Sequence, residues 1–122
     1  MSYGIYIDEK IQAVCLVHEG EVSWDEMNSA RADLNQRAQT LGLKRMLVDA
    51  SSMTVLPSVT EQFEFVSEHP SNLPRGVRLA IVMRPALLQG ALFSEQVSVN
   101  RGVAMKVFDS VASARQWLIG TS

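Results

Sequence analysis

Two polar residues follow apolar runs at positions where a binding or catalytic site could form. Asp49 comes after Met46-Leu47-Val48, and Arg84 comes between the run at residues 77–83 and Pro85. Open α/β sheets bind their ligands at the carboxyl ends of parallel strands, so a carboxylate and a guanidinium there could make a small enzyme. The alternatives are an Asx turn at Asp49 and a surface arginine at Arg84, and we favour both of them.

Ser58 is a candidate for phosphorylation and also a candidate helix cap. It opens the segment Ser58-Val59-Thr60-Glu61, which fits the S-x-x-E capping box. A capping serine accounts for the residue without any further role. A phosphate at a helix N-terminus would also be electrostatically favourable, so the two interpretations are compatible.

The remaining reactive residue types form no recognisable site. His18 and His69 have no cysteine or carboxylate at ligand spacing nearby, whereas zinc sites and nucleophilic triads need such partners. The sequence also contains no glycine-rich nucleotide-binding motif and no nucleophile elbow. We therefore expect no catalytic residues, no metal and no cofactor.

Composition narrows the classes of partner and compartment. The 122 residues are 47% hydrophobic and 20% charged, with a formal net charge of −2. No basic stripe is present to neutralise phosphates, so no nucleic acid partner is expected. The single cysteine, Cys15, lies in an apolar run, which is typical of a buried thiol in a reducing compartment such as the cytoplasm. We expect neither a signal peptide nor a transmembrane segment.

Hydrophobic periodicity and capping signals predict nine elements in one domain, residues 1–122. The predicted order is β-β-α-β-α-β-α-β-α, which is an α/β fold with a mixed five-stranded sheet flanked by four helices. The expected strands cover residues 5–7, 11–17, 45–50, 77–83 and 103–109. The expected helices cover residues 23–42, 57–69, 84–102 and 110–120.

The second and third predicted helices carry more large apolar residues than one core-facing stripe needs. Val59, Phe63 and Val66 share one face of the second helix, and Phe65 points nearly opposite Phe63. Apolar residues wrap most of the third helix, which predicts burial on more than one side. The helices could simply pack on each other, or they could form an apolar groove or a subunit interface. The predicted binding residues are Phe65, Leu87, Leu88, Phe93 and Arg84, with Met53, Val55 and Leu56 lining the same region.

Three segments carry a resemblance to a known family: "GEVSWDE", "LVDASSMTVLPS" and "NRGVAMKVFDSVASARQWL". They resemble the SpoIIAA-like proteins, which include the anti-sigma-factor antagonists (STAS domains) and many small bacterial proteins of unassigned function. The resemblance covers essentially the whole chain and implies the same fold. In the antagonists the middle segment is similar to D-x-S followed by D-S-S-G, whose serine is phosphorylated. Asp49 and Ser58 match that aspartate and that serine, but Pro57, Val59 and Thr60 replace the residues around the serine.

Together these observations predict a cytoplasmic binding or regulatory module that is not an enzyme. Its partner would be a protein, a second copy of the chain in a homodimer, or a small apolar, lipid-like molecule at the surface of the second and third helices. The alternative is a small enzyme with its site near Asp49 and Arg84.

Overall fold

The computed structural model describes residues 3–120, which form five strands and five helices. The strands are β1 (Tyr3–Asp8), β2 (Ala13–Gly20), β3 (Arg45–Met53), β4 (Arg78–Met83) and β5 (Ala104–Phe108). The helices are α1 (Trp24–Leu41), α2 (Val59–Ser67), α3 (His69–Asn72), α4 (Pro85–Asn100) and α5 (Val111–Ile119). The predicted α/β class and element order are confirmed, with one helix more than predicted. The extra helix, α3, begins beside Pro70, whose fixed φ is tolerated in a first helical turn.

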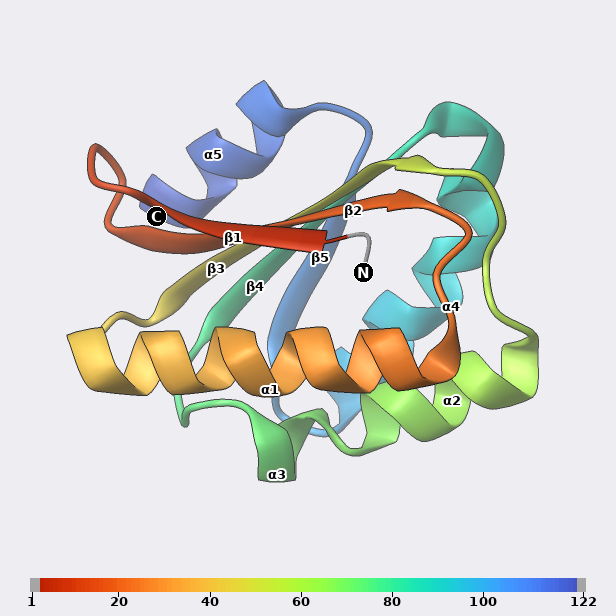
Figure 1. Ribbon diagram of the computed structural model, residues 1–122, viewed down its shortest axis with the longest axis horizontal. Coiled ribbons are helices and arrows are strands. Elements are labelled where there is room, and N and C mark those ends of the chain that lie inside the picture. The colour runs from red at the N-terminus through yellow and green to blue at the C-terminus, as the bar shows by residue number, and fades with distance from the viewer. Residues whose placement is uncertain (1–2, 121–122) are drawn as a thin grey trace.

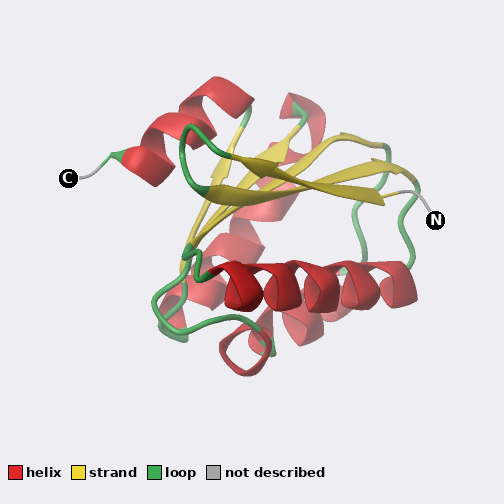
Figure 2. Cartoon of the chain, turned by 60° about the vertical axis from the view of Figure 1, so that its left-hand side comes forward, coloured by secondary structure: helices red, strands yellow, loops and turns green. Residues whose placement is uncertain are grey.

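The five strands form one mixed sheet in sequential order, β1-β2-β3-β4-β5. β1 pairs antiparallel with β2, and the other three pairs are parallel. Right-handed crossovers that always advance in one direction place their helices on the same face of the sheet. Accordingly α1 and α4 pack on one face, with α2 and α3 beside them, and α5 lies on the other face (Figures 1 and 2).

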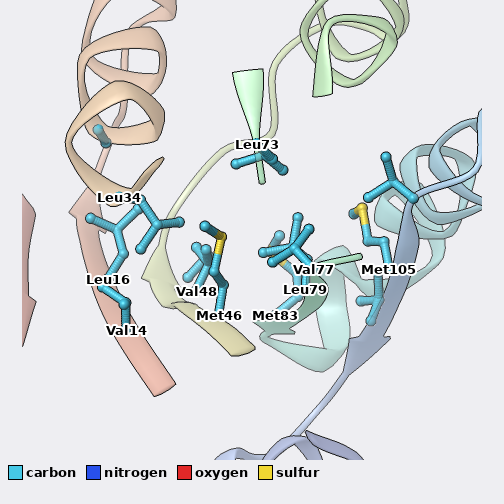
Figure 3. Close-up of a cluster of buried hydrophobic side chains, with 14 of the residues drawn as sticks. Val14, Leu16, Leu34, Met46, Val48, Leu73, Val77, Leu79, Met83 and Met105 are labelled. Carbon is cyan, nitrogen blue, oxygen red and sulfur yellow. The ribbon is translucent and has the colours of Figure 1, made fainter. Parts of the chain in front are cut away.

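Successive side chains of each strand pack into two separate hydrophobic cores, because they point to opposite faces of the sheet in turn. Val14 and Leu16 of β2 join the larger core under α1 and α4. Cys15, between them, joins the smaller core under α5. Figure 3 shows side chains of the larger core rising from the strands toward Leu34 of α1 and Leu73. Full burial of each such aliphatic side chain contributes about 1.5–3 kcal/mol.

Cys15 is fully buried, as the sequence predicted. Burial raises the pKa of its thiol, so the reactive thiolate is disfavoured.

Helix α1 begins and ends at the capping residues that the sequence predicts, Ser23 and Gly42. Ser23 Oγ accepts the Glu26 backbone N–H at 3.1 Å, and Gly42 closes the helix at a left-handed φ of 69°. Helical spacing in the sequence predicts an inward stripe made of Trp24, Met27, Ala30, Leu34, Ala38 and Leu41, and the structure differs from it at two positions. Leu41 is exposed, while Arg31, which was not predicted to face inward, is buried.

The apolar stripe predicted for α2 is wrong at two of its three residues. Val66 is buried, but Val59 and Phe63 are exposed, and Gln62 takes the buried position one turn before Val66. Phe65 faces α1, where its ring packs edge-on against Trp24 at 5.9 Å between centroids. With Phe65 in this position, Gln62 and Val66 are the buried residues of the helix.

Candidate functional site

Asp49 lies inside β3 rather than at its end, because the strand continues to Met53. It points to the face covered by α5, in alternation with Val48 and Ala50 of the larger core. Its Oδ1 accepts two hydrogen bonds from Ser51, one from the backbone N–H at 3.0 Å and one from Oγ at 2.6 Å. An Asx turn at Asp49, the alternative to a site residue, has hydrogen bonds of this kind.

Arg84 is exposed and immediately precedes α4. Its Nε donates to the backbone oxygen of Ser51 at 3.4 Å. Asp49 and Arg84 therefore both form hydrogen bonds with Ser51. The described part of the chain contains no ion pair between them.

Ser58 is the N-cap of α2 and forms a complete capping box. Its Oγ accepts the Glu61 backbone N–H at 3.2 Å, and Glu61 Oε1 accepts the Ser58 backbone N–H at 3.2 Å. Ser58 is exposed, so the hydroxyl is also open to solvent.

Replacing Ser58 tests how much of its role is the cap. We expect Ser58→Ala to lower the free energy of unfolding by about 1 kcal/mol, because Glu61 N–H loses its acceptor. Ser58→Asp should change it little, because a carboxylate caps as well and favours the positive end of the helix dipole. Urea denaturation of both variants measures this. An alanine variant as stable as the wild type would leave the serine free for another role.

A cavity of about 120 Å³ lies between the sheet and the helices α1, α2 and α4. Its walls come from β2, β3, β4 and β5 on one side and from α1, α2, α3 and α4, with Leu73, on the other. Leu16, Leu34, Val48 and Leu73, which are labelled in Figure 3, belong to this wall. Apolar side chains make up most of it.

Five polar residues interrupt the apolar wall: His18, Arg31, Gln62, His69 and Ser94. Two of them satisfy each other where α2 meets α4. Ser94 Oγ donates to Gln62 Oε1 at 2.8 Å, and Gln62 Nε2 donates to the Pro57 carbonyl at 3.0 Å. This pair joins the two helices and the segment that enters α2.

Arg31 forms a second buried polar cluster, which joins α1 to α2 and α3. One terminal nitrogen donates to the Phe65 carbonyl and contacts His69 Nδ1 at 3.2 Å. The other donates to Asn28 Oδ1 and to Glu68 Oε1, both at 3.1 Å. The guanidinium also lies 4.1 Å from the centre of the Phe65 ring. Four acceptors thus surround its two terminal nitrogens.

Burial lowers the pKa of both histidines of the cavity wall and keeps them neutral at pH 7. Burial, with a smaller contribution from Arg31, lowers the pKa of His69 to about 3. Burial also lowers the pKa of His18, and the charge of Glu26 offsets this only partly. Arg31 is therefore the charged group among these five polar residues.

Leu56, which lies in the segment between β3 and α2, is one of the residues of the cavity wall. It lines the cavity and approaches α4 at Gly90, where a Cβ atom would lie 2.8 Å from Leu56 Cδ1. A glycine inside a helix costs about 1 kcal/mol relative to alanine. Here the missing side chain gives Leu56 its place against the helix.

The predicted binding residues divide into three groups. Phe65 lines the cavity, as do Met53 and Leu56 from the preceding segment. Leu87 and Leu88 are half-buried and pack against the larger core. Phe93, Arg84 and Val55 are exposed and lie outside the cavity wall.

The sequence interpretation missed the polar members of the wall, although a signal for them exists. His18 continues the alternation of Val14 and Leu16, so a strand pattern places it on the core face. Gln62 precedes the buried Val66 by four residues, and Ser94 follows the buried Ala91 by three. Helical spacing therefore places each on a buried face.

Residues 3–120 contain neither a metal-binding cluster nor a membrane-spanning helix. No group of three or more His, Cys, Asp or Glu side chains is arranged to hold a metal ion. No helix in this range is long and apolar enough to cross a membrane.

Comparison with known proteins finds the same architecture among solved structures. The sequence matches no protein-family profile, and it matches no curated protein. The structure is similar to that of an uncharacterized protein from the DUF3478 family with a SpoIIAA-like fold, from Shewanella loihica PV-4. The match has a TM-score of 0.60 at 14% sequence identity, and it covers 96% of this chain and 92% of the other. At this identity the likeness concerns the fold.

Proposed function

We propose that this protein, whose fold is SpoIIAA-like, is a non-enzymatic module that binds a small apolar molecule in its cavity. The observation that carries the proposal is the cavity of about 120 Å³ between the sheet and the helices α1, α2 and α4. We take the whole chain, residues 1–122, as one domain, and a reducing compartment such as the cytoplasm as its setting.

The energetics of empty space support a ligand. Atoms that line a void lose contacts on one side, and an empty cavity costs about 24 cal/mol per Å³ in large-to-small core variants. This cavity is partly open to solvent, and an apolar ligand of matching size would restore such contacts and remove the apolar wall from water. Leu56, packed against Gly90, is the side chain that we propose must move for a ligand to enter.

The chemistry of the wall supports binding rather than turnover. Catalysis by proton transfer needs an acid or base within reach of a bound substrate. Gln62 and Ser94 bond each other, Arg31 is surrounded by four acceptors, and His18 has no nucleophilic side chain bonded to its Nδ1 within the described part of the chain. Asp49 and Arg84, the pair that an enzyme would use, lie outside the cavity wall. We therefore propose that the molecule is bound and released unchanged.

Native mass spectrometry of the freshly purified protein tests the proposal. We expect the folded chain to carry a noncovalent apolar adduct that is lost when the protein is denatured. Toluene, added to protein stripped of ligand, should shift the NMR methyl signals of cavity residues such as Leu16 and Leu34. Methyl signals of the α5 core, such as those of Leu118, serve as the control. No adduct and no selective shift with toluene would contradict the proposal.

Filling the cavity gives an independent test on stability. Ala91 of α4 is buried and lines the cavity, whereas Ala114 of α5 is buried in the other core. We expect Ala91→Leu to leave stability unchanged or to raise it by up to about 1 kcal/mol, because the added carbons enter empty space. Ala114→Leu should cost about 1–3 kcal/mol, because it overpacks a filled core. Equal losses in urea denaturation would contradict the cavity.

Exposed apolar side chains support self-association as a second candidate function. Val59, Phe63, Leu92 and Phe93 are exposed on α2 and α4. A second copy of the chain would cover them in a homodimer, since large apolar patches on soluble monomers commonly serve contacts. The same native mass spectra distinguish the two candidates, because they report the oligomeric state together with any adduct.

A further inference from the structure

A second pocket, of about 250 Å³, lies at the amino ends of β4 and β5. Its wall consists of residues 69–70 of α3, residues 73–77 before β4 and residues 101–103 before β5. It is separate from the cavity of the proposed function, although His69 and Leu73 contribute to both walls. It can therefore hold a ligand of its own.

Two arginines from different segments give this wall a positive charge. Arg75 and Arg101 are both exposed and both line the pocket. The described wall contains no carboxylate, and neither arginine forms an ion pair within residues 3–120. His69, the third titratable residue of the wall, is neutral at pH 7, because burial lowers its pKa to about 3. The pocket therefore carries two positive charges that the described chain does not neutralise.

The charged residues beside the wall do not offset these two cations. Glu68 directly precedes the wall, but its Oε1 is paired with Arg31 at 3.1 Å. Lys44 adds a further cation, because its Nζ donates to the Arg75 carbonyl at 2.8 Å. Like charges brought together by the fold repel one another, and a bound anion would relieve the repulsion between Arg75, Arg101 and this lysine.

We infer that this pocket binds a small phosphate monoester, whose phosphate group pairs with Arg75 and Arg101. A phosphate monoester carries a charge of about −1.5 to −2 at pH 7, which matches the two guanidinium groups. Guanidinium N–H groups form short, charge-assisted and often bidentate hydrogen bonds with phosphate oxygens. A carboxylate carries a single charge and would neutralise one arginine.

The rest of the wall and its volume indicate the part of the ligand that bears the phosphate. The apolar residues of the wall are Pro70, Leu73, Pro74, Val77 and Val103. A cavity of about 150 Å³ accommodates benzene in other proteins, and the larger volume here leaves room for a phosphate group beside such a ring. Phenyl phosphate is therefore the probe of choice. Inorganic phosphate lacks its apolar part, and benzoate lacks its second charge.

Titration of these three compounds into the full chain at pH 7, followed by NMR, tests the inference. We expect phenyl phosphate to shift the backbone amide signals of Gly76 and Gly102, because both residues lie in the wall. Gly20, at the carboxyl end of β2, is the internal control. Inorganic phosphate and benzoate should each bind at least tenfold more weakly. Equal shifts at all three glycines would show a nonspecific ion effect and overturn the site.

Arg75→Gln and Arg101→Gln supply the variants, and Lys106→Gln is the control that removes the same charge. Lys106 is exposed and follows Met105 of the larger core, so it points to the face covered by α5. We expect each arginine variant to bind phenyl phosphate about tenfold more weakly than the wild type, the ratio that one lost charge-assisted hydrogen bond gives. The control should stay within about twofold, because salt screens a distant charge.

Three results would contradict the inference. Unchanged affinity in both arginine variants, or an equal loss in Lys106→Gln, would overturn the site. Benzoate binding as tightly as phenyl phosphate would overturn the phosphate class. Inorganic phosphate binding as tightly would overturn the apolar part of the ligand. None of these results bears on the cavity, because the wall of the cavity contains neither Arg75 nor Arg101.

Discussion

Arg31→Ala should lower the free energy of unfolding by about 3 kcal/mol or more, because it removes the donor that joins a buried polar cluster. The guanidinium bonds the Phe65 carbonyl, which also accepts the Glu68 backbone N–H at 3.3 Å, and it contacts His69 Nδ1, which loses this partner in the variant. Each buried acceptor left unsatisfied costs about 1–3 kcal/mol. The lost contact with the Phe65 ring adds about 0.5–2 kcal/mol.

Two control variants separate this cluster from general effects on α1. Arg37 lies on the same helix and is exposed, so Arg37→Ala should change stability by no more than about 0.5 kcal/mol. Arg31→Lys keeps the charge, but an ammonium cannot reach four acceptors that surround a planar fork. We expect it to recover less than half of the loss. Urea denaturation measures all three variants, and similar values for Arg31→Ala and Arg37→Ala would contradict the assigned role.

The loss should also appear locally. Arg31 joins α1 to the residues at the end of α2 and the start of α3, which have no strand pairing to hold them. We therefore expect hydrogen exchange in Arg31→Ala to increase most at residues 62–72, which include the helices on one side of the cavity.

The architecture could be predicted from the sequence because each element carries its own local signal. Ser23 and Gly42 mark the ends of α1, and Ser58 with Glu61 marks the start of α2. The apolar runs at β3 and β4 are typical of strands covered on both faces. Alternation of strands and helices then leaves right-handed parallel crossovers as the standard topology. The short helix α3 has no such signal, because it contains Pro70, a residue type that usually interrupts a helix but is tolerated in the first turn.

The orientation of α2 could not be predicted, because periodicity ranks residues by hydrophobicity and ignores what each must contact. Val59 and Phe63 are more apolar than Gln62, yet Gln62 is buried. The reason is tertiary: Phe65 packs on Trp24, and Ser94 of α4 supplies the partner that lets Gln62 enter the core. Neither contact has a signal in the local sequence.

The cavity could not be predicted for a related reason. Its volume is a small difference between the space that the backbone encloses and the side chains that fill it. The surplus of apolar residues on α2 and α4 led to a predicted surface made of Phe65, Leu87, Leu88 and Phe93. In the structure Phe65 alone of these four lines the cavity. The wall also contains the polar residues His18 and Arg31. Their residue types alone do not indicate a cavity.

The wild type should lose stability steeply between pH 6 and pH 4, and His69 should account for a large part of that loss. The residue is 3% exposed, and its pKa falls from 6.5 to about 3 on folding. As the pH drops below 6.5, the unfolded chain binds a proton at His69 while the folded chain does not. The contribution to stability is therefore complete above about pH 6.5 and is lost progressively toward pH 3.

His69→Gln isolates this contribution, because an amide oxygen still accepts from Arg31 but does not titrate in this range. A full proton of difference is worth about 1.4 kcal/mol per pH unit. Between pH 6 and pH 4 the wild type should thus lose roughly 2–3 kcal/mol more than His69→Gln. His18 and all other ionisable groups are present in both proteins, so their contributions cancel in the comparison. Urea denaturation at half-unit pH steps provides the two curves. Parallel curves would show that His69 is protonated in the folded state at ordinary pH, and the neutral acceptor assigned to it beside Arg31 would then be wrong.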